Sequence, residues 1–285
     1  MTAVVLFPGQ GSQLKGMGRD LFDRYPELTS EADRVLGYSI RELCVDDPRG
    51  ELGQTQFTQP ALFVVNALTY RARADDGGRA PAFAAGHSLG EYNALLAAGC
   101  FDFATGVALV KARGALMGRV SGGGMSAVIG LAPDRIQQVL HDSEAGRRLD
   151  VANFNSFEQT VIAGPKADLE FAKPALEAAG ARVIPLNVSA PFHSRYMRDA
   201  QGEFEQFLRR YDFQPPSIPV ISNVHARPYD GDVRATLAAQ IGSSVRWLDS
   251  MLHLLEQPEP AFEEVGPGQV LTKLLKQIQK RRSKS

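Results

Sequence analysis

The sequence is poor in cysteine, has no excess of charge of either sign and lacks a long apolar run. Its 285 residues include only two cysteines, Cys44 and Cys100, and no His/Cys cluster has metal-ligand spacing. Lys and Arg number 31 against 32 Asp and Glu, for a formal net charge of −1. We therefore expect no metal site, no nucleic-acid partner and no attraction to an anionic membrane.

The first residues do not have the pattern expected of a targeting signal. The apolar run within 1–10 (MTAVVLFPGQ) is too short for a signal peptide or a membrane span, and turn residues follow it at once. We expect a cytoplasmic location and no membrane contact. Hydrophobic residues make up 44% of the chain, which is enough for one large domain or for one domain that carries a smaller insert.

Short apolar runs alternate with helical patterns in both outer parts of the chain. Strands separated by helices predict an α/β fold, with a mostly parallel sheet and helices on both faces. The predicted strands are 3–7, 82–85, 218–224 and 261–265, and the predicted helices are 58–73, 91–98, 104–117, 194–211, 233–241, 247–255 and 269–280.

The middle of the chain has a different order of elements, β-α-β-β-α-β, which is typical of a ferredoxin-like unit. We interpret it as an inserted small subdomain at 125–189, and the large subdomain then comprises 1–124 and 190–285. The glycine run at 121–124 is interpreted as a hinge. The predicted elements are strand 126–131, helix 133–141, strands 149–154 and 160–164, helix 167–179 and strand 182–188.

A candidate nucleophile lies in the stretch GHSLG at 86–90, which fits the pattern G-x-S-x-G. In a nucleophile elbow the glycines permit a strained turn from strand to helix, and this turn exposes the serine hydroxyl above the sheet. A strand is predicted before Ser88 and a helix after it, as the motif requires. The alternative is an ordinary turn with a helix-capping serine.

A serine at its ordinary pKa needs a base, and His193 is the best placed histidine. It lies in SAPFHS (189–194), where the chain leaves the insert and where a cleft between subdomains is expected. The alternative is a loop histidine without a role. No convincing acid follows a strand between Ser88 and His193, so we expect a dyad in which a backbone carbonyl orients the imidazole.

Two further features bear on the chemistry. Arg113 lies late in a predicted helix and is either a solvated surface residue or a bidentate partner for a carboxylate. The loop FPGQGSQ (7–13) lacks the Lys-Ser/Thr of a phosphate loop. It can instead supply the backbone N–H of Gln10 to an oxyanion, together with the N–H of Leu89.

Seven blocks of sequence together resemble the malonyl-CoA:acyl-carrier-protein transacylases. They occur in the order of that family and cover almost the whole chain. The resemblance implies an α/β-hydrolase-like large subdomain with an inserted ferredoxin-like small one, which matches the division above. The blocks are FPGQGSQ (7–13), TQPA (58–61), GHSLGEY (86–92), RG (113–114), VANFNS (151–156), APFHS (190–194) and EVGPGQVLTKL (264–274).

The resemblance also implies a ping-pong acyl transfer from malonyl-CoA. Ser88 would attack the malonyl thioester with His193 as general base and then general acid. The malonyl ester would pass to the phosphopantetheine thiol of an acyl carrier protein. Gln10 and Leu89 match the oxyanion donors of the family, and Arg113 matches the residue that binds the malonate carboxylate.

The same resemblance places Gln59 and Asn155 at polar positions of the active site. Phe192 fits the malonyl-selective pattern, in which a bulky ring crowds the α-carbon of the acyl group. No cofactor is implied, and we expect a monomer. One departure is the stretch SSVRW (243–247), where the family often has Asn-Pro-Val before an aromatic residue. It leaves open which backbone carbonyl orients His193.

Several functions remain as alternatives. The stretch 43–70 resembles the discrete acyltransferases that serve polyketide synthases in trans, the group of the disorazole synthase enzyme, and we favour that pathway over housekeeping fatty-acid synthesis. A serine esterase or thioesterase shares G-x-S-x-G, and a patatin-like lipase would have only Asp76-Gly77 to match its acidic motif. A non-catalytic carrier-binding module is a third class. The basic stretch 273–284 is either a solvated tail or a docking surface.

Overall fold

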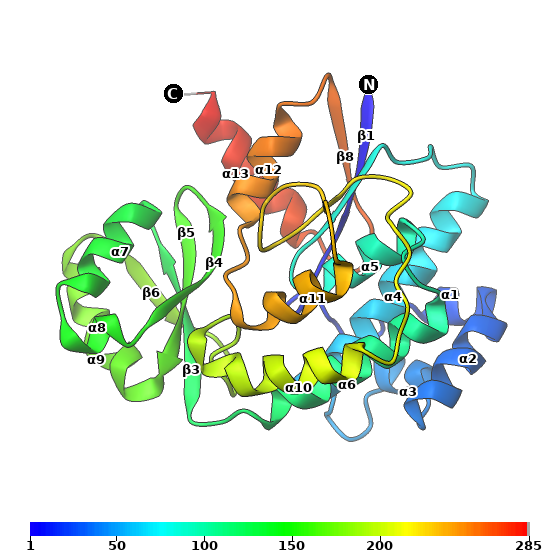
Figure 1. Cartoon of the computed structure of the whole chain (residues 1–285), viewed down its shortest axis with the longest axis horizontal. Coiled ribbons are helices and arrows are strands. Elements are labelled where there is room, and N and C mark those ends of the chain that lie inside the picture. Colours follow the sequence, from blue (N-terminus) through cyan, green and yellow to red (C-terminus); the bar gives the residue numbers. More distant parts are fainter. Residues whose placement is uncertain (284–285) are drawn as a thin grey trace.

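The computed structural model of the protein describes residues 1–283 and contains two four-stranded sheets, each with its own helices (Figure 1). The first sheet has the strand order β7-β2-β1-β8, and all its pairs are parallel. Parallel neighbours need crossover connections, which the helices provide. The strands are β1 (Thr2–Phe7), β2 (Phe83–Gly86), β7 (Val220–Ile221) and β8 (Pro260–Glu264).

Helices cover both faces of this sheet, as expected. Because side chains alternate along a strand, Val5 and Phe7 of β1 belong to one hydrophobic cluster, whereas Val4 and Leu6 belong to another that includes Trp247. The helices of this part are α1 (Arg19–Arg24), α2 (Pro26–Leu36), α3 (Ile40–Val45), α4 (Thr55–Asp75), α5 (Gly90–Ala97), α6 (Phe103–Arg119), α10 (Arg198–Leu208), α11 (Val233–Gly242), α12 (Trp247–Leu255) and α13 (Val270–Arg282).

The second sheet is antiparallel and has the order β4-β5-β3-β6. Its helices come between its strands in the chain, and the resulting order is that of a ferredoxin-like unit with one additional short helix. The green part of Figure 1 shows this unit beside the larger one. Its elements are β3 (Gly123–Ile129), α7 (Pro133–His141), α8 (Glu144–Arg147), β4 (Asp150–Ser156), β5 (Gln159–Pro165), α9 (Lys166–Ala178) and β6 (Arg182–Pro185).

The two-subdomain α/β fold predicted from the sequence is therefore confirmed. The subdomain boundaries that we placed after residues 124 and 189 stay a prediction. None of the helices within residues 1–283 is long and apolar enough to cross a membrane. Of the basic stretch at the C-terminal end, α13 carries all but the last residues, and Lys284 lies outside the described residues.

Several local predictions were wrong. The glycine run at 121–124 is not a free hinge, because Gly123 and Gly124 begin β3. A Cβ on Gly123 would lie 2.6 Å from Cδ of Pro191, so the glycine permits close packing of the chain that leaves the small subdomain. β7 is two residues long instead of seven, and Pro219 immediately before it cannot donate to a strand ladder.

Helix boundaries also differ from the predictions. The helix α4 begins at Thr55, three residues before the predicted start at Thr58, and Pro60 lies inside it. The predicted helix 194–211 is a 3-10 turn at Arg195–Met197 followed by the shorter α10. The helices α1, α2, α3 and α8 were not predicted. For α1, α3 and α8, of six residues or fewer, there are too few turns for a clear hydrophobic period, whereas the 11-residue α2 was simply missed.

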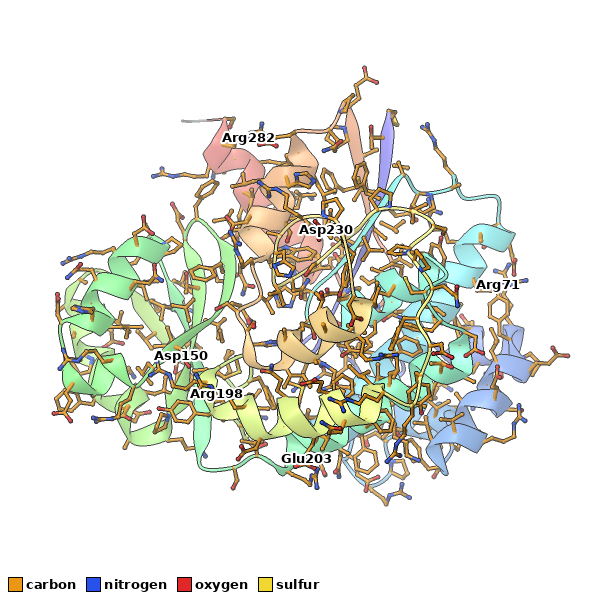
Figure 2. All side chains as sticks on the ribbon, in the orientation of Figure 1. Arg71, Asp150, Arg198, Glu203, Asp230 and Arg282 are labelled. Atoms are coloured by element: carbon orange, nitrogen blue, oxygen red, sulfur yellow. The ribbon has the colours of Figure 1, made fainter. Side chains whose placement is uncertain are left out.

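Charged side chains lie mainly at the periphery, where Figure 2 labels Arg71 and Glu203. Arg71 pairs with Asp75 at 3.1 Å and Glu203 with Arg119 at 2.7 Å, in exposed contacts that contribute little to stability. Arg113 and Glu91, by contrast, are buried charged residues, with 1% and 0% of their surfaces exposed. Buried charges of this kind are costly unless they are paired or functional.

Candidate active site

Ser88 lies on a sharp turn between β2 and α5. Its φ is 50°, a left-handed value that is rare for a residue with a side chain. A Cβ on Gly86 would lie 1.9 Å from the backbone carbon of Gly90, and a Cβ on Gly90 would lie 2.0 Å from the carbonyl oxygen of Phe7. Both glycines of G-x-S-x-G are therefore required by the crowding of strand and helix, and the geometry is that of a nucleophile elbow.

Asn223, just after β7, braces this turn. Its Oδ1 accepts a hydrogen bond from the Ser88 amide at 2.7 Å, and its Nδ2 donates to the Gly86 carbonyl at 2.7 Å. One side chain thus satisfies a backbone donor and a backbone acceptor of the strained turn, neither of which has a partner within it. Such bonds hold an unfavourable φ in place.

His193 is brought next to Ser88, with its Nε2 2.7 Å from the serine Oγ. Its Nδ1 lies 3.0 Å from the carbonyl oxygen of Gln240 and 3.2 Å from that of Ser243. Since carbonyls only accept hydrogen bonds, Nδ1 carries the hydrogen and Nε2 presents its lone pair to the serine hydroxyl. Backbone carbonyls orient this imidazole, and Ser243 belongs to the stretch that departs from the family pattern.

The electrostatic surroundings keep His193 neutral. Burial lowers its pKa to about 3, and the nearby positive charge of Arg113 acts in the same direction. A neutral imidazole that accepts a hydrogen bond from a serine hydroxyl is ready to act as a base.

Arg113 is not a solvated surface residue: it extends from α6 into the interior and reaches the nucleophile. Its Nη1 donates to Oε1 of Gln59 at 2.7 Å, and its Nη2 donates to Ser88 Oγ at 3.1 Å and to Oε1 of Gln240 at 2.9 Å. The guanidinium carbon lies 5.3 Å from the centre of the Tyr92 ring. The hydrogen-bond partners are neutral oxygens, and among residues 1–283 the buried Nε has no partner at all. The positive charge is therefore available to an anion.

The remaining predicted residues lie around this centre. Gln59 contacts Arg113, as described above. Asn155 does not reach Ser88; its Oδ1 lies 2.9 Å from Nε2 of His87, whose ring packs against Trp247 with the ring centres 5.4 Å apart. Phe192 is buried in the hydrophobic core beside His193 in the chain. Asn155 thus supports the elbow through His87.

The loop after β1 lies directly against the elbow. A Cβ on Gly9 would come within 2.3 Å of the His87 carbonyl oxygen and 3.6 Å of the Leu89 nitrogen. Across residues 1–283, neither the Gln10 amide nor the Leu89 amide donates to a protein acceptor. The structure thus leaves two backbone donors free near Ser88, which an oxyanion hole requires.

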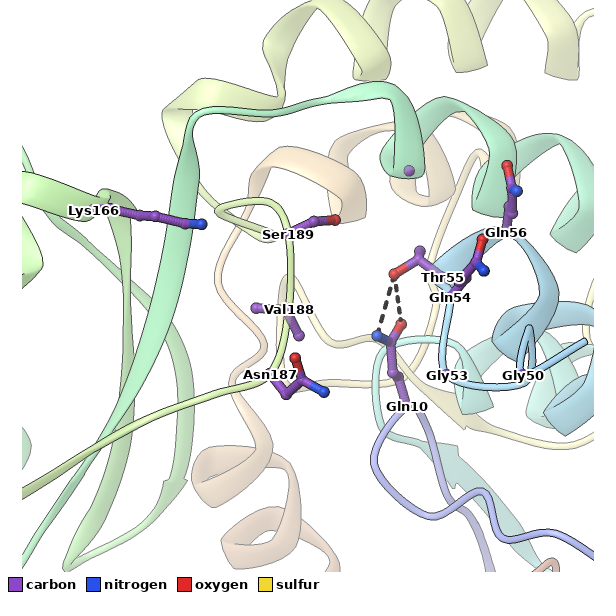
Figure 3. Close-up of a pocket in the computed structure, with 11 residues that line it drawn as sticks. Gln10, Gly50, Gly53, Gln54, Thr55, Gln56, Lys166, Asn187, Val188 and Ser189 are labelled. Atoms are coloured by element: carbon purple, nitrogen blue, oxygen red, sulfur yellow. Dashed lines mark hydrogen bonds between the residues drawn. The ribbon is translucent and has the colours of Figure 1, made fainter.

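Two cavities flank the site along the junction of the subdomains. One of about 580 Å³ is lined by Gln10, by the start of α4 and by Lys166 and 187–189 of the small subdomain. Figure 3 shows Gln10 at its wall, where Nε2 donates to Oγ1 of Thr55 at 3.2 Å. The other, about 860 Å³, has His193 in its lining.

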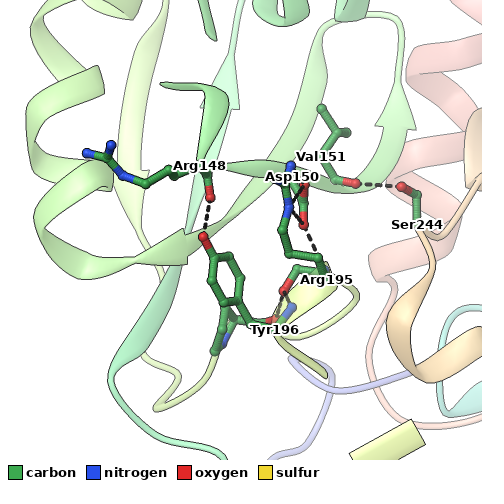
Figure 4. Close-up of polar contacts among 8 residues, drawn as sticks. Arg148, Asp150, Val151, Arg195, Tyr196 and Ser244 are labelled. Carbon is green, nitrogen blue, oxygen red and sulfur yellow. Dashed lines mark hydrogen bonds and ion pairs between the residues drawn. The ribbon is translucent and has the colours of Figure 1, made fainter. Parts of the chain in front are cut away.

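Polar contacts join the subdomains beside the second cavity (Figure 4). The Arg195 amide donates to Oδ2 of Asp150 at 2.7 Å, and the two side chains form an ion pair. The hydroxyl of Ser244 donates to the Val151 carbonyl at 2.6 Å. Arg195, which follows the base, and Ser244, which follows the carbonyl of Ser243, are thus both hydrogen-bonded to β4.

Sequence reasoning missed the residues behind the nucleophile. Gln240 of α11 donates from Nε2 to the Ser88 carbonyl at 2.9 Å and to Glu91. The other carboxylate oxygen of Glu91 accepts a hydrogen bond from the Tyr229 hydroxyl. Glu91 was within the quoted block GHSLGEY, but nothing in the sequence linked it to residues about 140 positions away.

The site brings together a serine on an elbow, a neutral histidine, two free amides and a buried cation, which is typical of enzymes that use a serine nucleophile. The chain belongs to the acyl transferase domain family, whose model matches residues 4–284. It is therefore an acyltransferase, and the resemblance inferred from the seven blocks is confirmed.

Individual relatives agree with this assignment. The polyketide biosynthesis malonyl CoA-acyl carrier protein transacylase PksC of Bacillus subtilis is 52% identical over 278 residues, 96% of each chain. The malonyl CoA-acyl carrier protein transacylase of Escherichia coli K12 is 42% identical and covers 96% of this chain and 91% of its own. The chain also matches PksE of B. subtilis at 51% identity but spans only 36% of its length.

Solved structures of such enzymes have the same fold. The malonyl CoA-acyl carrier protein transacylase of Burkholderia pseudomallei superimposes with a TM-score of 0.95 at 50% identity, over 99% of both chains.

Proposed function

We propose that this enzyme transfers a malonyl group from malonyl-CoA to the phosphopantetheine thiol of an acyl carrier protein. The observation that carries the proposal is the buried guanidinium of Arg113, which touches Ser88 Oγ at 3.1 Å and has no carboxylate among its hydrogen-bond partners. An acyl group with a free carboxylate would supply the missing anion. The names of the relatives, which act on malonyl-CoA and carrier protein, support this choice of acyl group.

In the first half-reaction, Ser88 Oγ attacks the thioester carbonyl while Nε2 of His193 takes the hydroxyl proton. The negative charge that develops on the carbonyl oxygen is stabilised by the free amides of Gln10 and Leu89. When the C–S bond breaks, the imidazolium returns the proton to the departing sulfur of CoA. In the second half-reaction the carrier thiol loses its proton to His193 and attacks the malonyl ester, and Ser88 regains its hydrogen.

The carboxylate of the bound malonyl group would form charge-assisted hydrogen bonds with the guanidinium of Arg113, whose Nη2 lies 3.1 Å from Ser88 Oγ. A site built around a guanidinium leaves that charge unpaired when an uncharged acyl group binds, and so discriminates against acetyl groups. Phe192, beside the base, would limit the space for a branched acyl group. The cavity at Gln10 is a suitable path for the polar pantetheine arm, because its lining includes Gln54 and Asn187.

Incubation with malonyl-CoA, followed by intact-protein mass measurement, tests the proposal. A lasting malonyl adduct that is absent in Ser88→Ala supports transfer, and its discharge by a phosphopantetheinylated carrier protein completes the reaction. Rapid hydrolysis without an adduct would instead indicate an esterase or thioesterase. If Ser88→Ala behaved like the wild type, Ser88 would not be the nucleophile. A carrier-binding module would then remain only if the chain itself added nothing to the rate of transfer.

We further propose that the carrier proteins belong to a polyketide synthase that is served in trans, with fatty-acid synthesis as the alternative. The higher identity to PksC than to the E. coli enzyme supports this pathway. Comparing kcat/KM for carrier proteins of the two pathways distinguishes them. A preference for the fatty-acid carrier would reverse the assignment.

The enzyme is also proposed to be a cytoplasmic monomer that works without a cofactor. Within residues 1–283, no group of three or more His, Cys, Asp or Glu side chains is arranged to hold a metal ion. Dialysis against a chelator should leave the rate of malonyl loading unchanged. Sedimentation at several protein concentrations should give the mass of one chain.

A further inference from the structure

A buried carboxylate lies behind the nucleophile and has no role in the acyl-transfer steps. Glu91, in the first turn of α5, is fully buried. Its Oε1 accepts a hydrogen bond from the Tyr229 hydroxyl, and its Oε2 accepts one from Nε2 of Gln240 and one from the Asn223 amide at 3.3 Å. A buried acid with three donors is costly to build and calls for a function.

The side-chain amide of Gln240 connects Glu91 to Arg113, because both its oxygen and its nitrogen make hydrogen bonds. Its Oε1 accepts from Nη2 of Arg113 at 2.9 Å, and its Nε2 donates to the Ser88 carbonyl at 2.9 Å as well as to Glu91. If the amide turned by 180°, its NH₂ group would face the guanidinium and its oxygen would face the Ser88 carbonyl. Both contacts would then be repulsive.

A carboxylate is an acceptor without a donor, so Glu91 allows only the NH₂ end of Gln240 to face it. Tyr229 and the Asn223 amide, both donors, hold the carboxylate itself. Burial raises the pKa of Glu91 to about 7, and the three donors oppose that effect. The Gln240 amide thus lies between the Glu91 carboxylate and the Arg113 guanidinium, and its dipole is aligned between the two charges.

We propose that Glu91 and Tyr229 are positioning residues that anchor the Gln240 amide, whose orientation the guanidinium and the Ser88 carbonyl already favour, and thereby set Arg113 in place for the malonate carboxylate. The inference rests on the proposed function, since it concerns the acyl carboxylate. It predicts that loss of Glu91 harms malonyl loading more than acetyl loading, because only the malonyl group has a carboxylate for Arg113 to bind.

The experiment measures single-turnover loading of Ser88 from malonyl-CoA and from acetyl-CoA. Glu91→Ala should lower the malonyl-to-acetyl rate ratio about 10-fold. Glu91→Gln should restore the ratio to within about 3-fold of wild type, because its amide oxygen can face Gln240 and its NH₂ can face the Tyr229 oxygen. Tyr229→Phe, which removes one of three donors, should lower the ratio about 3-fold.

Asp168→Ala is the matched control. Asp168 is a largely buried carboxylate in the small subdomain, where it accepts hydrogen bonds from Arg148 at 2.7 and 3.0 Å and contacts neither Arg113 nor Gln240. Its loss should reduce thermal stability without changing the malonyl-to-acetyl ratio. An equal change of the ratio in this control would overturn the proposal, because general loosening would then explain the effect.

A double variant tests whether Glu91 acts through Gln240. Gln240→Leu keeps the backbone carbonyl that faces His193 and removes the side-chain amide, so Glu91→Ala should change the ratio no further in this background. Additive effects would overturn the proposal. A wild-type enzyme that loads malonate, with a ratio unaltered in Glu91→Ala and Tyr229→Phe, would overturn only this inference. Failure of the wild type to load malonate would overturn the proposed function itself.

Discussion

Nη2 of Arg113 donates a hydrogen bond to Oγ of Ser88 at 3.1 Å. The cation proposed to bind the acyl carboxylate therefore touches the nucleophile itself. Because Oγ also lies 2.7 Å from Nε2 of His193, the serine hydroxyl accepts from one side and donates to the other. Its hydrogen is thus directed at the base.

Replacing Arg113 should separate malonyl from acetyl chemistry. In Arg113→Ala, loading from malonyl-CoA should fall about 100-fold more than loading from acetyl-CoA. The reason is that loss of a buried charge-assisted contact costs about 2–5 kcal/mol. Arg113→Lys should recover part of the difference, since it keeps the charge but not the planar fork. Rapid-quench measurement of both rates checks the expectation, and equal losses would refute the clamp.

Removing the base should abolish efficient acylation. We expect His193→Ala to lower the rate of Ser88 loading about 10²- to 10⁴-fold while the far-ultraviolet circular dichroism stays that of the wild type. His253→Ala, on α12 and outside the site, serves as the control with an unchanged rate. A variant without His193 that loads at the wild-type rate would place the base elsewhere.

The low pKa of His193 should make the folded state sensitive to acid. Its folded pKa, about 3, lies below the ordinary histidine value of 6.5, so the unfolded chain binds this proton first. Stability is therefore lost as the pH falls below about 6.5, and this one group accounts for about 2 kcal/mol between pH 7 and pH 5. Urea unfolding at several pH values should show a shallower decline for His193→Ala. Parallel curves would contradict the assignment.

Loss of Asn223 should release the elbow. Asn223→Ala leaves the Ser88 amide and the Gly86 carbonyl without their partner, at a cost of about 1–3 kcal/mol in stability for each buried group that stays unsatisfied. We expect a lower melting temperature and a loading rate reduced about 10-fold from both acyl donors. Ser222→Ala, one residue earlier, should keep the loading rate. An unaffected rate in Asn223→Ala would show that the turn needs no brace.

The parts of the site that could be predicted are those with a local signature. Ser88 is surrounded by glycines whose spacing encodes a crowded turn, and His193 lies at a change of subdomain. The burial of Arg113 could not be decided, because a helix pattern does not tell which face a long cation follows. The family resemblance indicated that Arg113 binds a carboxylate, and it also placed Asn155 near the site.

The residues that could not be predicted are neutral amides and short segments. Gln240 and Asn223 contact Ser88 only because the fold brings α11 and the end of β7 to the same turn. Neither residue lies in a distinctive stretch of sequence. Gly123 looked flexible in sequence, yet it serves close packing against Pro191. Tertiary contact, rather than local preference, decided each of these positions.

Backbone hydrogen bonds connect β4 of the small subdomain to the segment that orients the base. The Phe154 amide donates to the Val245 carbonyl at 2.9 Å, and the Val245 amide donates to the Ala152 carbonyl at 2.8 Å. Ser88 is anchored to the parallel sheet, whereas the peptide of Ser243 follows β4. The position of the base relative to Ser88 therefore depends in part on the contact between the two subdomains, because Ser243 contributes one of the two carbonyls that face His193.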